Sequence, residues 1–277
     1  MNKVLVLAAN GNVGKHLVNA LLVQGAHVKA ATRNGQNINE AEGVVFDFND
    51  MSTWENALKD VKSAYVMLPM GYNDKQALTK FLDMLLALNI KIVLQGSVEH
   101  YDTPKNMYYA AEQQLKQSGK TYVILRPTWF MDNFKILWQQ DLRNHKLQLP
   151  LQYGKSALID ARDIADCGVQ ALLSHQFDNQ AFNLTGGELL TYAEAIEIIA
   201  ENTQLPITFE YASPQKYRLL LQEQGMPDAT INFFLGILQE IEDGVTEVTT
   251  DGVQTLTGNQ PRKLANYAKD NAQLWQK

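Results

Sequence analysis

The chain of 277 residues contains a single cysteine, Cys167, so it cannot form an internal disulfide. It also lacks a basic surplus, because its net charge is −6 and no basic run is interleaved with aromatic residues, which argues against a nucleic-acid partner. No apolar stretch reaches membrane length, and Asn10 and Gly11 interrupt the first apolar run too early for a signal peptide. We therefore expect a cytoplasmic protein with no membrane partner.

The histidines also lack the spacing of a metal site. The five are scattered through the chain and form no paired motif; they are His16, His27, His100, His145 and His175. We expect no bound metal.

The first fourteen residues contain the strongest functional signal. Lys3 to Leu7 is an apolar run typical of a buried parallel strand, and the turn Ala8 to Gly14 follows at once. Residues 15–24 have a helical apolar stripe that ends at Gly25. A strand, a glycine turn and a helix in this order predict a dinucleotide site, in which free N–H groups of the first helical turn face the pyrophosphate.

One position departs from the glycine pattern of extended short-chain reductases. Ala8 stands where that pattern has a glycine, and alanine does not readily adopt a left-handed backbone conformation. We expect a slightly different or slightly strained turn. The alternative is a turn that binds no nucleotide.

The second strand, residues 27–32, ends without an acidic residue. A site that prefers NAD usually has a carboxylate there to bind the ribose hydroxyls, but the strand runs into Arg33. A guanidinium suits a 2′-phosphate, so we expect NADP as the cofactor, with NADPH preferred over NADH. The alternative for Arg33 is a solvated loop cation.

Further strands and helices alternate up to about residue 150. Strands are expected at 43–46, 63–68, 91–94 and 121–125, and helices at the capping box of residues 52–55, at 75–88 and at 107–117. This alternation predicts a doubly wound parallel α/β sheet, a Rossmann fold, with ligands at the carboxyl ends of the strands. The ends that this rule brings together are Ala8–Gly14, Arg33, Asp47, Leu68–Tyr72, Gln95–Ser97 and Pro127–Phe130.

The regular alternation of strands and helices changes in the second half of the chain. We therefore divide the chain into a nucleotide-binding domain, 1–150, and a smaller, mostly helical α/β portion, 151–277. We do not expect this second portion to fold independently. Asp163 is expected to cap a helix that extends to Leu173, and Thr191 with Glu194 forms a second capping box. Further helices are expected at Ser213-Pro214, at Pro227-Asp228 and from Pro261 to Trp275.

Several segments, taken together, resemble atypical short-chain dehydrogenase/reductases of the NmrA-like group. These segments are Ala9–Gly14, Thr32–Asn34, Asn89–Val93 before Gly96-Ser97, Ala111–Leu115, Ile124–Asn133, Asp160–Ala165, Phe182–Gly186, Thr191–Glu194 and Asp270–Ala272. The resemblance extends nearly from end to end. It implies an NAD(P)-binding Rossmann domain in a group that includes quinone, azo-dye and triphenylmethane-dye reductases, together with redox-sensing regulators that do not turn over a substrate.

The resemblance also implies roles for individual residues. Those implied to bind the cofactor are Ala8, Asn10, Gly11, Asn12, Val13, Gly14, Arg33, Asp47, Phe48, Leu68, Pro69, Met70, Gly96, Ser97, Pro127, Thr128, Trp129 and Phe130. Within this set, Asp47 and Phe48 would flank the adenine. An aromatic substrate could stack on Tyr72, Trp129 or Phe130.

The Tyr-x-x-x-Lys proton relay of ordinary short-chain reductases is absent. The tyrosine position holds Pro104 and the lysine position holds Tyr108. The catalytic residues are therefore unknown, with Ser97 and Tyr108 as candidates, and we expect Glu112 to lie on a helix surface or to support the site indirectly.

Two functions remain open at this stage. The first is reduction of a small quinone-like, azo or other conjugated aromatic substrate by hydride transfer. The alternative is a non-catalytic NAD(P)-binding sensor that binds a protein partner, motivated by Ala8 and the missing relay. The oligomeric state is expected to be a monomer or a homodimer.

Overall fold

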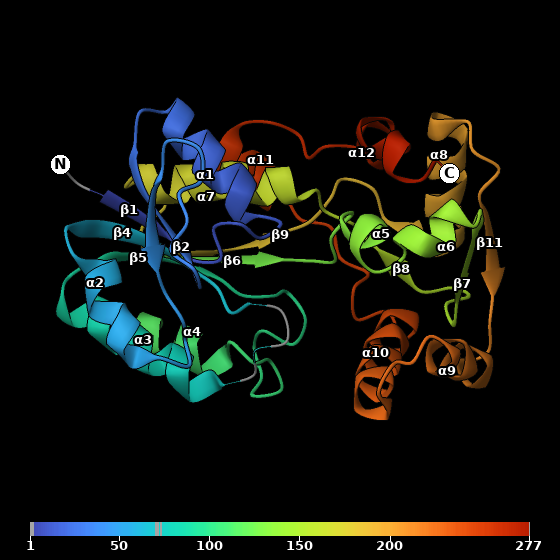
Figure 1. Ribbon diagram of the computed structural model, residues 1–277, viewed down its shortest axis with the longest axis horizontal. Helices are drawn as coiled ribbons and strands as arrows, with labels where there is room; N and C mark the ends of the chain where they lie inside the picture. Colours follow the sequence, from blue (N-terminus) through green and yellow to red (C-terminus); the bar gives the residue numbers. More distant parts are fainter. Residues whose placement is uncertain (1–2, 70–71, 73, 277) are drawn as a thin grey trace. The chain divides into compact units, whose positions relative to one another are not determined.

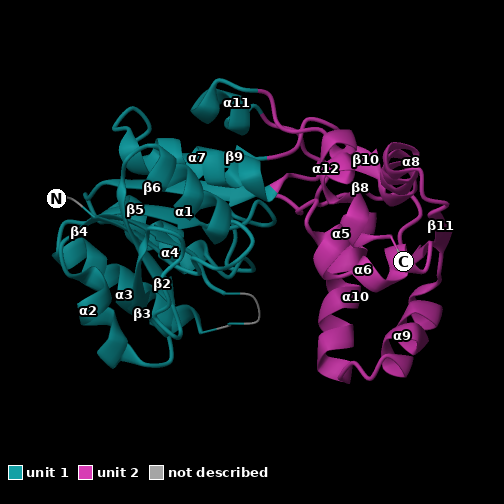
Figure 2. Ribbon diagram, turned by 45° about the horizontal axis from the view of Figure 1, so that its top comes forward, with its two compact units in different colours: residues 1–127, 161–184, 251–259 teal, residues 128–160, 185–250, 260–277 magenta. Residues whose placement is uncertain are grey.

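The computed structural model describes residues 3–69, 72 and 74–276, which form two compact units (Figure 2). Unit 1 contains residues 1–127, 161–184 and 251–259, and unit 2 contains residues 128–160, 185–250 and 260–277. The chain passes between the units several times, so a single boundary near residue 150 does not coincide with this division.

A parallel sheet forms the centre of unit 1 (Figure 1). Within the described residues it has seven strands in the order β3-β2-β1-β4-β5-β6-β9. They are β1 (Lys3–Val6), β2 (His27–Thr32), β3 (Glu42–Val45), β4 (Val61–Val66), β5 (Lys91–Gln95), β6 (Tyr122–Pro127) and β9 (Gln180–Leu184). The predicted doubly wound α/β fold is confirmed. The strand order reverses beside β1, and this is where such sheets bind ligands.

Helices cover both faces of the sheet, which explains why its strands are continuous apolar runs (Figure 1). One layer contains α1 (Gly14–Val23), α7 (Ala161–Leu173) and α11 (Gly252–Thr257), and α7 packs against the other two. The opposite layer contains α2 (Trp54–Leu58), preceded by a 3-10 turn (Met51–Thr53), then α3 (Lys75–Ala87) and α4 (Tyr109–Gln117).

Unit 2 is mostly helical and has its own core. Its helices are α5 (Asn133–Ile136), α6 (Gln139–Arg143), α8 (Tyr192–Thr203), α9 (Pro214–Glu223), α10 (Asp228–Glu242) and α12 (Leu264–Asn271), followed by a 3-10 turn (Ala272–Leu274). Short sheets pair β7 (Lys146–Leu149) with β11 (Thr208–Tyr211), and β8 (Lys155–Ser156) with β10 (Leu190–Thr191). Large buried rings, including those of Phe134, Tyr192 and Trp275, fill its centre.

The predicted helix starts differ in accuracy. The capping box of Thr191 and Glu194 is confirmed, with both reciprocal hydrogen bonds present, and Ser213 caps α9 with Pro214 in its first turn. The capping box at Ser52 is wrong, because Asp50 accepts the Ser52 N–H and starts the 3-10 turn two residues earlier. Asp163 lies inside the first turn of α7, which begins at Ala161.

Candidate functional site

The glycine turn after β1 has a tight backbone geometry. Ala8 has a left-handed backbone conformation, with a φ of 49°, and its carbonyl accepts a hydrogen bond from the Gly11 N–H at 2.8 Å. A Cβ on Gly14 would lie 2.1 Å from the Ala8 oxygen, and one on Gly11 would lie 3.0 Å from it. The turn therefore keeps the conformation that glycine would adopt. We expected either a different turn or a strained one, and the structure has the strained turn.

The turn offers unpaired backbone donors at the start of α1. In the described part of the chain, the N–H groups of Asn12, Val13 and Gly14 have no hydrogen-bond acceptor. No side chain caps the helix, and its first turn contains no acidic residue. An anion at this position would therefore meet free N–H groups and the positive end of the helix dipole. The residues present fit the pyrophosphate of a dinucleotide.

The end of β2 adds a positive charge. Arg33 is exposed, and its guanidinium makes no hydrogen bond or ion pair with the residues that the structure describes. Its neighbours Thr32 and Asn34 instead pair with each other, through a 3.1 Å hydrogen bond from Thr32 Oγ1 to Asn34 Oδ1. Arg33 is therefore available to a ligand, as a 2′-phosphate contact requires.

The end of β3 joins an aromatic cluster. Phe48 is 5% exposed and packs edge-on against Phe46 and Trp54. Tyr72, expected to stack on a substrate, lies over Phe48, with ring centroids 5.3 Å apart. Its hydroxyl is buried and has no partner among the described residues, and burial raises the pKa of this phenol. The structure thus places Tyr72 with Asp47 and Phe48, where the adenine is expected.

The loop after β4 is held by Tyr108. Leu68 is buried, and its backbone N–H forms a hydrogen bond with the Tyr108 hydroxyl. Burial raises the pKa of Tyr108 to about 12, so this phenol is a poor proton donor at neutral pH, and the geometry favours a positioning role. Pro69 is exposed and accepts a hydrogen bond from the Tyr72 N–H, whereas Met70 lies outside the described residues.

Ser97 is oriented by a residue that sequence reasoning missed. The Asn106 side-chain amide donates to Ser97 Oγ at 2.9 Å and to the Glu99 carbonyl at 2.6 Å. The Asn106 side-chain oxygen accepts the Tyr108 N–H at 2.7 Å. Gly96 lies next to this network, and a Cβ there would make ordinary 3.5 Å contacts with Tyr108. An isolated asparagine before a helix carries no sequence signal for this role.

The helix-surface interpretation of Glu112 is wrong. Its side chain is fully buried and accepts two hydrogen bonds from Arg126, at 2.8 Å from Nε and 2.5 Å from Nη2. Arg126 is the residue before the last in β6, and it lies over the Tyr101 ring, 4.0 Å from its centroid. A buried ion pair between β6 and α4 therefore lies beside Gly96.

The last predicted segment spans both units. Pro127 ends β6, and its carbonyl accepts the Val98 N–H at 3.1 Å, whereas Thr128, Trp129 and Phe130 belong to unit 2. The Thr128 hydroxyl is buried without a partner among the described residues, and Trp129 lines a cavity inside unit 2. Phe130 forms a β-bridge to Ile159.

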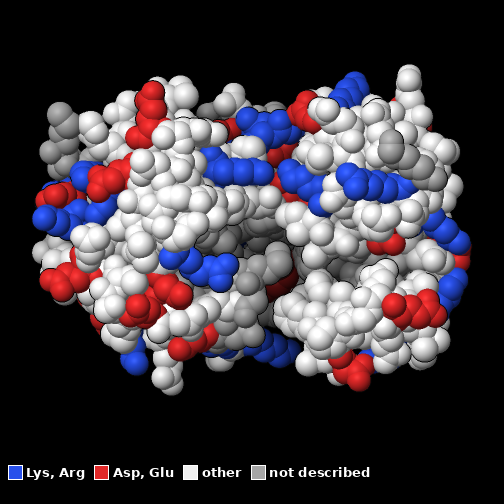
Figure 3. Space-filling view, viewed as in Figure 1, with Lys and Arg blue, Asp and Glu red and all other residues white. Residues whose placement is uncertain are grey.

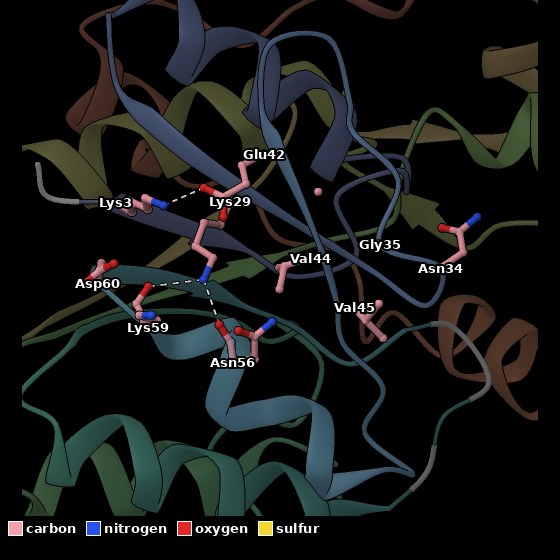
Figure 4. Close-up of a pocket in the computed structure, with 11 residues that line it drawn as sticks. Lys3, Lys29, Asn34, Gly35, Glu42, Val44, Val45, Asn56, Lys59 and Asp60 are labelled. Atoms are coloured by element: carbon pink, nitrogen blue, oxygen red, sulfur yellow. Dashed lines mark hydrogen bonds and ion pairs between the residues drawn. The ribbon is translucent and has the colours of Figure 1, made fainter.

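A larger cavity of about 440 Å³ lies in unit 1 (Figure 4). Its lining extends along the β2–β3 edge of the sheet, from Lys3 and Asp60 at the amino ends of strands to Asn34 and Val45 at the carboxyl ends. The Lys29 ammonium donates to the Asn56 and Lys59 carbonyls, and burial lowers its pKa. Among the described residues that line it, none belongs to the turn Ala8–Gly14, so this cavity does not include the expected pyrophosphate site.

The described residues bear on two further expectations. They contain no group of three His, Cys, Asp or Glu side chains that could hold a metal ion. Their helices are all too short or too polar to cross a membrane.

On the face shown in Figure 3, Lys and Arg side chains lie close to Asp and Glu side chains over unit 1.

Comparison with known proteins gives a consistent picture. The model of the NmrA-like family matches residues 1–269. The chain is 28% identical to the uncharacterized oxidoreductase YesF of Bacillus subtilis, covering 99% of this chain and 96% of YesF. It is 25% identical to the NAD(P)H azoreductase of Xenophilus azovorans, covering 97% of this chain and 98% of that enzyme. Among solved structures, the NADPH complex of a quinone oxidoreductase from Escherichia coli has a TM-score of 0.84 at 17% identity, covering 97% and 99% of the two chains.

Proposed function

The chain belongs to the NmrA-like family, and we propose that it is an NADPH-dependent reductase of quinone-like, azo or other conjugated aromatic compounds. The observation that carries the proposal is the pair of unsatisfied features in unit 1: the free N–H groups of Asn12, Val13 and Gly14, and the guanidinium of Arg33, which has no partner in the described chain. Relatives named as an azoreductase and a quinone oxidoreductase support the same class of reaction.

Different residues would bind different parts of the nucleotide. The N–H groups at the start of α1 would bind the pyrophosphate, and Arg33 would bind the adenosine 2′-phosphate. Asp47, Phe48 and Tyr72 would border the adenine, whose polar edge could satisfy the buried Tyr72 hydroxyl. When bound, NADPH would supply the hydride.

The acceptor class follows from the missing proton relay. Hydride addition to a quinone or an azo dye leaves a delocalised anion, and hydride addition to a cationic conjugated dye leaves a neutral product, so little acid catalysis is needed. Tyr108 is buried with a pKa of about 12, and Asn106 fixes the Ser97 hydroxyl. These residues would position the acceptor ring and the loop beside it, with Ser97 as the remaining hydrogen-bond donor.

The experiment is an acceptor panel. Purified protein is incubated with NADPH and a set of quinones and azo dyes, and loss of the reduced nicotinamide absorbance is followed. We expect turnover with at least one acceptor, and slower turnover with NADH. Absence of nucleotide oxidation with every acceptor at millimolar concentration would contradict the reductase proposal.

The cofactor preference has its own test in Arg33→Ala. Loss of a charge-assisted hydrogen bond costs about 1.5–3 kcal/mol, so the Kd for NADPH should rise roughly 10- to 100-fold while that for NADH stays the same. Lys80→Ala removes an exposed charge on α3 and serves as the control. An unchanged ratio of the two affinities would overturn the phosphate assignment.

The second candidate is a non-catalytic NAD(P) sensor that binds a protein partner. The missing Tyr-x-x-x-Lys relay favours it, because Pro104 and Tyr108 stand at the two relay positions and the nearby Glu112 carboxylate is paired with Arg126. The sensor predicts saturable quenching of tryptophan fluorescence by the nucleotide and a nucleotide-dependent partner in pull-down experiments, without turnover in the acceptor panel.

A further inference from the structure

Unit 2 contains a cavity of about 110 Å³ that the proposed nucleotide site does not use. Residues of β7, α6 and the adjacent helices α9 and α10 line it. Its wall includes the rings of Trp129, Trp138, Tyr217 and Phe234. An engineered apolar cavity that holds one benzene molecule has roughly 150 Å³, so this smaller cavity can take no more than a single ring.

Aromatic side chains make this cavity selective for flat or cationic groups. Trp138 and Tyr217 are 5% and 8% exposed, and Trp138 is fixed edge-on against Tyr192 at a centroid distance of 5.6 Å. Burial raises the pKa of Tyr217 to about 12, so its hydroxyl stays neutral at physiological pH. Such rings bind an aromatic ligand by stacking and an organic cation through their electron-rich faces.

One carboxylate lines the same cavity. Asp141 of α6 forms no hydrogen bond or ion pair with the described residues, although its side chain is partly buried. Burial raises the pKa of Asp141, and no neighbouring cation opposes this effect. A partly desolvated carboxylate without a partner gains much from a cationic ligand, because the pairing replaces lost hydration.

We propose that this cavity binds a single aromatic ring that bears an ammonium group, with the Asp141 carboxylate as its counter-ion. The ring packs among Trp129, Trp138 and Phe234, and the ammonium donates to the carboxylate. This assignment does not depend on the reductase proposal, because every residue that carries it belongs to unit 2.

The test is calorimetric titration of the full chain, without nucleotide, with benzylammonium and with its neutral near-isostere benzyl alcohol. Quenching of tryptophan fluorescence provides a second readout, since two of the four tryptophans line the cavity. We expect benzylammonium to bind about 10-fold more tightly than the alcohol. Equal affinity for the two probes, or no binding of benzylammonium at millimolar concentration, would overturn the proposal.

Two variants locate the site. Asp141→Asn should weaken benzylammonium binding about 10-fold and leave benzyl alcohol unaffected, whereas Glu197→Gln, an equal charge change on an exposed part of α8, should change neither affinity. Leu220→Trp should fill the cavity and abolish binding of both probes. It keeps the proposal testable should Asp141→Asn fail to fold. Benzylammonium binding that survives in Leu220→Trp would place the site elsewhere.

Discussion

Ala8 combines a functional turn with an unfavourable backbone conformation. A left-handed conformation costs an alanine about 1–2 kcal/mol relative to a right-handed one, yet the Ala8 carbonyl must face the Gly11 N–H for the turn to close. Close packing of Gly14 against that carbonyl prevents the turn from relaxing. The sequence predicted a departure at this position, but only the backbone reveals that it is strain and not a new turn.

Ala8→Gly should therefore stabilise the protein. The left-handed conformation costs glycine nothing, and the greater flexibility of glycine in the unfolded chain offsets part of the gain, leaving about 0.5–1 kcal/mol. Ala9→Gly is the matched control: Ala9 is fully buried without a positive φ, so this variant should lose about 1 kcal/mol. Urea unfolding measures both values. A destabilised Ala8→Gly variant would contradict the strain.

The buried Glu112–Arg126 pair makes a second prediction at the residue scale. Glu112→Gln leaves the Arg126 guanidinium without its counter-charge in a buried site, which should cost about 3–5 kcal/mol of unfolding free energy. The double variant Glu112→Leu with Arg126→Met removes both charges and should lose much less than Glu112→Leu alone. Equal losses in these two variants would mean that the charges do not interact, and denaturant unfolding compares them directly.

At the scale of elements, Glu210 ties β11 to β7 and α9. It accepts hydrogen bonds from Lys216 at 2.8 Å and Gln148 at 2.9 Å, and it forms an ion pair with Lys146. The hydrogen bond from Lys146, followed by that from Lys216, lowers the pKa of Glu210 to about 2. The charge therefore links β7 to β11 and α9, two neighbouring elements that follow much later in the sequence.

The stability that this charge provides depends on pH. Because the pKa is lower in the folded protein than its ordinary 4.5, the contribution is complete above about pH 4.5 and disappears as the pH falls to about 2. Glu210→Gln should be less stable than the parent at neutral pH, and the difference should vanish over this range. Urea unfolding at a series of pH values measures it, with Glu197→Gln as the control. A difference independent of pH would show that the charge is not responsible.

Local signals predicted most elements of the chain. Strand β2 has the predicted bounds, residues 27–32, and the Thr191 capping box is formed in full, because both depend on neighbours in the sequence. The Ser52 capping box failed because Asp50, two residues earlier, is the stronger acceptor for the same backbone N–H. Glu112 and Arg126 could not be paired in advance, because their contact exists only after α4 has packed on β6.

At the scale of the whole molecule, the order of strands and helices along the chain predicted the fold. The alternation of apolar strands and helices up to β6 is enough to predict a parallel sheet. It also predicts that ligands bind at the carboxyl ends of the strands, beside β1. The return of residues 161–184 and 251–259 to unit 1 was not predictable, because α7 looks like any amphipathic helix. The cavity of unit 2 depends on side chains from five separate segments and has no local signature.

The central claim is that free N–H groups after β1 bind the paired phosphates of a dinucleotide. Amide chemical shifts, recorded by NMR during titration with NADPH, test it at the atoms concerned. We predict saturable shifts for the amides of Asn12, Val13 and Gly14, and none for the distant Gly25 and Gly119. Unmoved signals for the first three at saturating nucleotide would contradict the account.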